Sequence, residues 1–304
     1  MGDWDDIKKN GSSDDKVHIA EQVLVSARAK STENLLFTRE DVRRWATAVS
    51  SPESKICCLL YGADGTAKTG IVFSYLTDQD VLDGKQLWVI DLDGGGLPLK
   101  LAYHKARDKN LVVINPLETC ETDEGTMIDY RKTFAKTRAI IEYVKQNWEK
   151  EKIKAIVFDG LSTALYHAEQ QMRVEKNLDV DGGVQQRYWI SRNKLFLETI
   201  ELIKRLPIAR FFIAHENFII PAAGEKSDVT KPPSQVVAKT NAMMIQKVRC
   251  SRIVTSSTVE FIAVIDKNKY NVGTEGSRIE VCKVNKGDKS FVWKANEVIK
   301  VLGG

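Results

Sequence analysis

The chain has 304 residues, of which 43% are hydrophobic and 28% charged, a balance typical of a globular protein with a sizeable core. Its five cysteines include no CxxC pair, which favours reduced thiols in a cytosolic compartment over a disulfide framework. No apolar run reaches the roughly 18–20 residues that a membrane span requires, and the acidic start argues against a signal peptide. The net charge of +4 permits a nucleic-acid partner without requiring one.

The N-terminal region is predicted to form a polar tail and two helices in front of the core. Helical spacing covers residues 17–29. A second helix follows Thr38 and Asp41, whose three-residue spacing resembles a capping box. We therefore expect two parts, residues 1–50 and the core at residues 51–304.

Short continuous apolar runs recur in the middle of the chain and indicate strands that are buried on both faces. They are Ile56–Leu60, Leu87–Ile90, Leu111–Ile114, Ala155–Phe158 and Phe211–Ala214. Segments with helical spacing lie between several of them, which predicts a mostly parallel sheet flanked by helices. Polar and apolar residues alternate near the C-terminus, as in Val259–Ile265, and predict antiparallel strands that extend this sheet. The expected fold class is α/β.

The clearest motif is a glycine-containing loop that follows the first strand. Its residues match GxxxxGK[ST] except that Ala67 replaces the second glycine, and they are Gly62, Ala63, Asp64, Gly65, Thr66, Ala67, Lys68 and Thr69, followed by Gly70. In such a loop, backbone N–H groups wrap phosphates at a helix N-terminus. Lys68 would neutralise the β- and γ-phosphates, and the Thr69 hydroxyl would bind Mg²⁺.

The loop therefore predicts a site for ATP and Mg²⁺. The alternative is a strand–helix turn that holds a Lys-Thr pair by chance; the strand before the loop and the helix after it favour the nucleotide site. Ala67 should weaken binding if the backbone at this position needs a positive φ.

Polar residues at the ends of three other strands are candidate partners of the loop. Asp159 follows a buried strand at the edge where ligands bind in such sheets, and we expect it to hold Mg²⁺ through water; the alternative is a cap on the next helix. Of the two acids at the end of the second strand, Asp93 is the better candidate to orient or deprotonate the attacking water. Asp91 is the other candidate, and its alternative role is structural. His215 and Glu216 follow the fifth strand and are candidate sensors of the γ-phosphate.

The order of these motifs resembles the RecA superfamily of ATPases, and within it the short phage-type proteins linked to single-strand annealing. The resemblance implies that Asp93 is the catalytic base, in place of a glutamate, and that Asp159 is the metal aspartate. It also implies that His215 and Glu216 replace an Asn-Gln sensor pair. The fold implied is a RecA-like P-loop core.

A second part of the resemblance lies in Asp266-Lys267-Asn268-Lys269. A Lys-Asn-Lys at the corresponding place in RecA reaches across the subunit interface to the γ-phosphate of the neighbour. The resemblance therefore implies that Lys267 and Lys269 act in trans on developing negative charge. The alternative is a basic turn on the surface.

The resemblance also implies the partners. Two segments, Tyr166–Gln186 and Phe218–Thr240, correspond to the loops that bind single-stranded DNA in this family. Charge and stacking in the second segment come from Phe218, Lys226, Lys231 and Lys239. We expect a homo-oligomeric ring or filament with no membrane contact, in the cytoplasm of a microbial host and encoded by that host or by a virus. Without the resemblance, a solvated loop is the favoured description of these segments.

Two other functions are compatible with the same motifs. A hexameric helicase or DNA-packaging motor shares almost all of them. A structural or regulatory protein that binds nucleotide without turnover is consistent with Ala67 and Asp93, which depart from the family pattern. The sequence leaves open the choice between strand exchange, annealing and translocation, and also the oligomer number.

Overall fold

The computed structural model describes residues 56–123, 125–179, 182–215, 239–240, 242–287 and 291–303. Several predictions fall outside these residues, namely the part formed by residues 1–50 with its two helices, and the side chains of Glu216, Phe218, Lys226 and Lys231. Within the described ranges, no helix is both long enough and apolar enough to pass through a bilayer.

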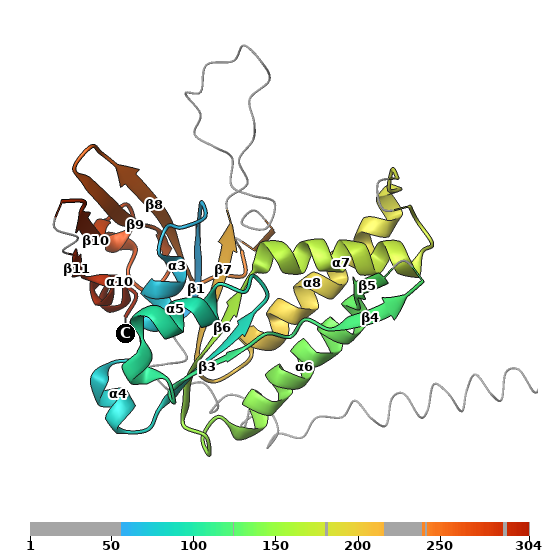
Figure 1. Ribbon diagram of the computed structural model, residues 1–304, viewed down its shortest axis with the longest axis horizontal. Coiled ribbons are helices and arrows are strands. Elements are labelled where there is room, and N and C mark those ends of the chain that lie inside the picture. The colour runs from blue at the N-terminus through green and yellow to red at the C-terminus, as the bar shows by residue number, and fades with distance from the viewer. Residues whose placement is uncertain are drawn as a thin grey trace, which may run out of the picture. The chain divides into compact units, whose positions relative to one another are not determined.

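A nine-stranded sheet forms the centre of the described part of the chain (Figure 1). Its strand order is β11-β10-β9-β8-β1-β7-β6-β2-β3. The six strands from β8 to β3 in this order are parallel to one another, and β9, β10 and β11 add antiparallel pairs at one side. The bounds are β1 Cys57–Gly62, β2 Gln86–Asp91, β3 Leu111–Ile114, β6 Ile153–Asp159, β7 Ala209–His215, β8 Gln246–Val254, β9 Thr258–Asn268, β10 Arg278–Asn285 and β11 Phe291–Trp293.

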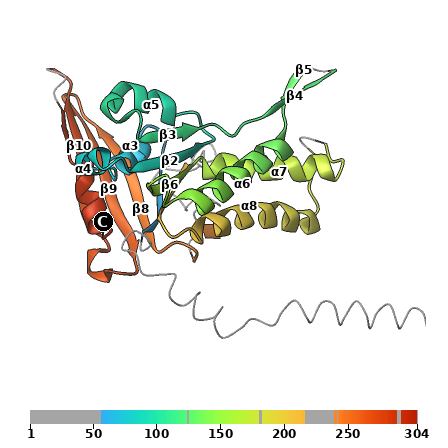
Figure 2. The same ribbon diagram turned by 90° about the horizontal axis from the view of Figure 1, so that it is seen from below.

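Helices cover both faces of this sheet (Figures 1 and 2). One face packs against α3 (Lys68–Phe73), α4 (Asp78–Leu82), α5 (Gly96–Tyr103) and α10 (Ala295–Val301). The other packs against α6 (Tyr130–Asn147), α7 (Leu161–Glu175) and α8 (Trp189–Lys204). Successive residues of a strand point to opposite faces, so both faces of β1 are apolar: Leu60 joins the first cluster and Leu59 the second. The predicted fold class, a mostly parallel α/β sheet flanked by helices and extended by antiparallel C-terminal strands, is confirmed.

All five apolar runs of the sequence form strands, but several elements were not predicted. They are the helices α4, α5 and α10, the strand β8, and a separate hairpin of β4 (Thr119–Thr122) and β5 (Gly125–Ile128). The expectation of a loop from Tyr166 is wrong for residues 166–175, which belong to the helix α7. The hairpin is largely exposed and therefore lacks the alternation that marks a half-buried strand. In β8 a signal was present, because Lys247, Arg249 and Ser251 alternate with the buried Val248 and Cys250.

Candidate nucleotide-binding site

The glycine-containing loop connects β1 to α3 at the carboxyl edge of the parallel strands. Gly62 is required here by close approach, because a Cβ on this residue would lie 2.0 Å from the carbonyl oxygen of Cys250. Gly65 has a φ of 65°, in the left-handed region that favours glycine. The loop backbone is thus shaped by the neighbouring strand β8 as well as by its own glycines.

Ala67 is the position at which the motif departs from glycine. Its backbone lies in the left-handed region, with φ 65° and ψ 16°, directly before the first residue of α3. An alanine in this conformation costs roughly 1–2 kcal/mol, since its Cβ crowds the following carbonyl oxygen. The condition under which Ala67 was expected to strain the loop is therefore met.

Replacing Ala67 with glycine is expected to raise the free energy of unfolding by about 0.5–1 kcal/mol. Relief of the left-handed strain exceeds the roughly 0.4–1 kcal/mol by which glycine favours the unfolded chain. Urea denaturation measures this change. Ala168→Gly, inside α7, is the matched control and should destabilise the protein, because glycine weakens a helix interior and leaves a void. Destabilisation by both substitutions would contradict the strain at residue 67.

The ammonium group of Lys68 lies inside the loop. Its Nζ atom donates hydrogen bonds to the carbonyl oxygens of Gly62, at 3.1 Å, and Ala63, at 2.7 Å. Only 5% of the residue is exposed. Burial lowers the pKa of Lys68 below its ordinary value, while nearby acidic groups, Asp159 among them, oppose this shift. A cation is therefore held where the loop would wrap a phosphate group.

Thr69 of the helix α3 and Asp159 of the strand β6 contact each other. The Thr69 hydroxyl donates a hydrogen bond of 2.8 Å to Oδ2 of Asp159, the last residue of β6. Burial raises the pKa of Asp159 to about 6, and the negative charges of Asp93 and Asp91 add to this increase. A buried carboxylate among other acids is stabilised by a cation.

The oxygen donors of Thr69 and Asp159 fit Mg²⁺, because this ion binds one or two protein oxygens and keeps the rest of its shell for water and phosphate. Within the described residues, no group of three or more His, Cys, Asp or Glu side chains offers a complete metal cage.

The two acids after β2 have different surroundings. Asp91 accepts hydrogen bonds of 2.8 Å from the backbone N–H groups of Gly94 and Gly96, so its carboxylate holds the turn that leads into α5. Asp93 instead contacts side chains from two other elements. Its Oδ2 lies 2.9 Å from Nε2 of His215, and its Oδ1 accepts a hydrogen bond from the Thr163 hydroxyl.

These contacts set the charge of Asp93. Burial alone would raise its pKa, but the hydrogen bonds from His215 and Thr163 outweigh burial, and the pKa is lowered. Asp93 is therefore ionised at neutral pH. The structure brings Asp93 and His215 together, one from the end of β2 and the other from the end of β7, on either side of β6.

Ser162 and Thr163 were not assigned to the site from the sequence. Ser162 bonds to the backbone of His215, accepting from its N–H at 3.1 Å and donating to its carbonyl at 3.3 Å. Gly160 makes room for this arrangement, since a Cβ there would lie 2.7 Å from Oδ1 of Asp93. The available signal was a pair of hydroxyl residues that begins three positions after Asp159.

Lys267 and Lys269 lie at the opposite edge of the sheet. Lys267 is the cross-strand neighbour of Lys247, and Asn268 is paired with Gln246, which in turn lies beside Cys58 near the start of β1. The loop begins at the other end of β1, about 13 Å further along the strand. The two lysines are therefore not brought to the phosphate loop of their own chain. Of the predicted DNA-contacting side chains, only Lys239 is described, and it is half-buried.

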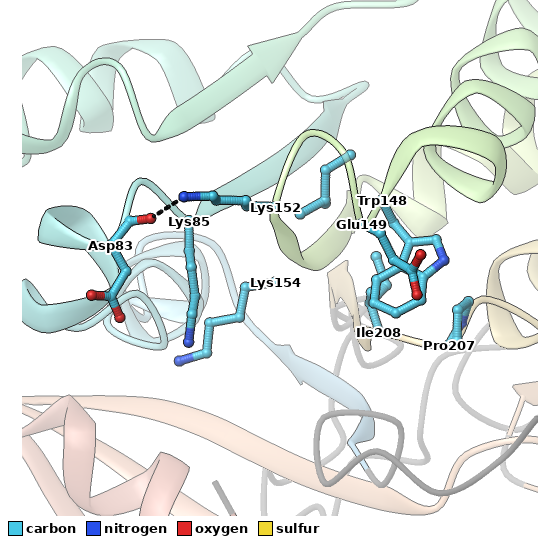
Figure 3. Close-up of a pocket in the computed structure, with 9 residues that line it drawn as sticks. Asp83, Lys85, Trp148, Glu149, Lys152, Lys154, Pro207 and Ile208 are labelled. Atoms are coloured by element: carbon cyan, nitrogen blue, oxygen red, sulfur yellow. Dashed lines mark hydrogen bonds between the residues drawn. The ribbon is translucent and has the colours of Figure 1, made fainter.

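A cavity of about 450 Å³ lies at this same edge of the sheet, and three lysines help to line it (Figure 3). Lys154 and Lys85 both reach the carboxylate of Asp80, at 2.6 and 3.1 Å, and Lys152 donates to the carbonyl oxygen of Asp83. Their charges are thus engaged by acceptors of the chain, so the cavity has no evident preference for an anion. The residues that fit a nucleotide are those at the carboxyl edge.

Comparison with known proteins identifies no family for this chain. No family model matches the chain, and no curated protein matches it. Among solved structures, the crystal structure of the RadB recombinase is similar with a TM-score of 0.42 and 16% sequence identity. The similarity covers 74% of this chain and 86% of that chain. The assignment of a function therefore depends on the geometry of the site itself.

Proposed function

We propose that this protein is a RecA-type ATPase that binds Mg-ATP between subunits and acts on single-stranded DNA in recombination or annealing. The observation that carries the proposal is the Thr69–Asp159 hydrogen bond beside the buried ammonium of Lys68. A strand-end carboxylate, a hydroxyl and a lysine in this arrangement are the groups that a P-loop uses for a triphosphate and its metal.

Each group has a role that follows from its surroundings. The loop N–H groups and Lys68 bind the β- and γ-phosphates. Thr69 and Asp159 would hold Mg²⁺, which when bound neutralises charge on the phosphate oxygens. Asp93 is ionised and accepts a proton from the water that attacks the γ-phosphorus. His215 and Thr163 orient this carboxylate through their hydrogen bonds.

Assembly in a ring or filament is supported by the cations at the far edge. Burial is the largest cause that lowers the pKa of Lys267. The nearby charges of Lys269 and Lys247 lower this pKa further. Like charges on paired strands destabilise a sheet, and within the chain the charge of Glu275 favours the protonated form of Lys267. In the proposed assembly the triphosphate of the next subunit is a further anion, which Lys267 and Lys269 contact in trans.

Action on DNA is supported by chain connectivity. The segment proposed to bind DNA, Phe218–Thr240, begins three residues after His215, whose ring lies against Asp93. A change in the contacts of His215 when the γ-phosphate is bound or lost would therefore act on the start of that segment. This link would couple nucleotide state to DNA affinity.

A second candidate is a protein that binds ATP without turnover. It is favoured by the engagement of both oxygens of Asp93, with Thr163 and His215, and by the left-handed backbone at Ala67. A carboxylate that is fully hydrogen-bonded is a weaker base.

The hexameric motor differs from the leading proposal mainly in assembly. Filaments on single-stranded DNA, rather than closed rings, are expected by electron microscopy.

Phosphate release with and without single-stranded DNA separates these candidates. We expect turnover that rises when DNA is added, and a loss of about 100-fold or more in Asp93→Asn with ATP binding retained. The substitution removes the proton acceptor but keeps the shape of the side chain. ATP binding without phosphate release, with or without DNA, would favour the second candidate. Full activity of Asp93→Asn would contradict the role of Asp93.

A further inference from the structure

Strand β8 continues past the end of β1 and runs beside the phosphate loop. Its pairing with β1 ends at Tyr61, opposite Arg249. The next residue of β8, Cys250, has its carbonyl oxygen against Gly62. The remaining residues, Ser251–Val254, are held by β9 alone, where Arg252 is paired with Phe261. The end of β8 thus lies alongside the loop.

The side chain of Arg252 lies against the loop. Its Nη1 atom is 3.4 Å from the position that a Cβ on Gly65 would take. Val248 and Cys250 belong to the apolar cluster on the α3 side of the sheet, and the two-residue period of a strand puts Arg252 on this same side. The guanidinium group is therefore on the face from which α3 and the loop emerge.

This guanidinium group has no partner among the described residues, where Arg252 makes no hydrogen bond and no ion pair. Arg249, three residues earlier and on the other face, does have one, since its Nε atom lies 3.6 Å from Oδ2 of Asp266. Arginine is always charged, and its planar fork suits phosphate oxygens better than a lysine does. An exposed guanidinium that has no partner in the described part of the chain and lies beside a candidate phosphate loop is suited to bind an anion.

Negative charges in and near the loop favour a second cation at this place. Asp64 lies within it, and its carboxylate accepts a 2.8 Å hydrogen bond from the N–H of Gly65. A triphosphate bound by the loop would lie close to this negative charge and to that of Asp159. Lys68 and the Mg²⁺ that Thr69 and Asp159 would hold offset part of this negative charge. A second cation in the same chain lowers the repulsion that the bound phosphates meet.

We infer that Arg252 is a cis cation of the nucleotide site, which contacts the phosphate groups held by the loop at Gly65. The inference depends on the proposed function, because it takes the loop to bind a triphosphate. It differs from the trans lysines in that Arg252 comes from the same chain as the loop and from a strand that no P-loop motif includes. Arg252 therefore strengthens binding before any neighbour is in place.

The test uses the full chain and two probes, Mg-ATP and inorganic triphosphate, titrated by calorimetry. Arg252→Ala is expected to weaken the binding of both by about 10- to 100-fold, the range for a lost hydrogen bond to a charged group. Arg252→Lys should recover part of the affinity, because it restores the charge without the fork. Arg249→Ala, which removes an arginine from the opposite face of the same strand, should leave both affinities unchanged. Equal melting temperatures show that the variants are folded.

Three outcomes would overturn the inference in different ways. Wild-type affinity in Arg252→Ala, while Lys68→Ala loses binding, would reject the role of Arg252 and leave the nucleotide site intact. A loss for ATP but not for inorganic triphosphate would place the guanidinium on the nucleoside instead of the phosphates. A wild-type chain that binds neither probe would reject the proposed function, and the inference with it.

Discussion

Replacing Lys68 with alanine is expected to reduce ATP turnover by about 1,000-fold, with ATP binding weakened as well. The ammonium group is buried in the loop, and its hydrogen bonds go to the carbonyl oxygens of Gly62 and Ala63. A group that is already positioned and desolvated stabilises developing charge without reorganisation. Phosphate release at saturating ATP and a binding titration measure the two effects.

Stability distinguishes this result from a folding defect. Burial lowers the pKa of Lys68, which means that the fold holds the ammonium at a cost. Lys68→Ala should therefore keep or raise the melting temperature while activity falls. Lys152→Ala, which removes an exposed lysine at the opposite edge of the sheet, is the control and should change neither quantity. Turnover close to that of the wild type in Lys68→Ala would reject the loop as a catalytic element.

Lys267→Ala is expected to lose about 1,000-fold in turnover by itself, as does removal of a cation that acts from a neighbouring subunit. Lys267 lies at the far end of the sheet from the loop of its own chain. A neighbour in a head-to-tail assembly can present this far edge to the loop. The loss should therefore affect turnover in the assembled state and leave the ATP affinity of a separate subunit nearly unchanged.

Mixing variants tests the trans arrangement directly. Subunits of Lys267→Ala keep the loop lysine, and subunits of Lys68→Ala keep the trans lysine. With equal amounts and random order in the assembly, about one interface in four has both lysines, so about a quarter of wild-type turnover is expected. In a control mixture, Lys283→Ala, on the neighbouring strand β10, replaces Lys267→Ala. The turnover of Lys283→Ala should not depend on the added partner variant in the way that the turnover of Lys267→Ala does.

The outcome that contradicts the trans role is specific. Both variants must form assemblies of wild-type size by chromatography. If they do and no mixing ratio restores phosphate release, the two lysines do not share a site. Full activity of Lys267→Ala alone would instead support the reading of residues 266–269 as a basic surface turn.

Local features of the chain were readable without the fold. The loop Gly62–Thr69 is contiguous, so the spacing of its glycine, lysine and threonine is already present in the sequence. Asp159 could be identified because a strand buried on both faces is a continuous apolar run, and the residue after it is at the edge of the sheet. The type and order of the main strands follow from the same burial pattern.

Other features depend on which strands become neighbours, and that is decided by packing between distant segments. Asp93 meets Thr163 and His215, which are 70 and 122 residues away, because β2 and β7 flank β6. Arg252 reaches the loop because β8 pairs with β1 and is longer than it. The sequence by itself determined the candidate phosphate loop, the position of Asp159 at the end of a buried strand and the α/β class, since each depends on residues adjacent in the chain. Only the tertiary structure decided how Asp93 is held, which edge of the sheet carries Lys267 and Lys269, and which arginine lies beside the loop, since these depend on pairings that local periodicity does not encode.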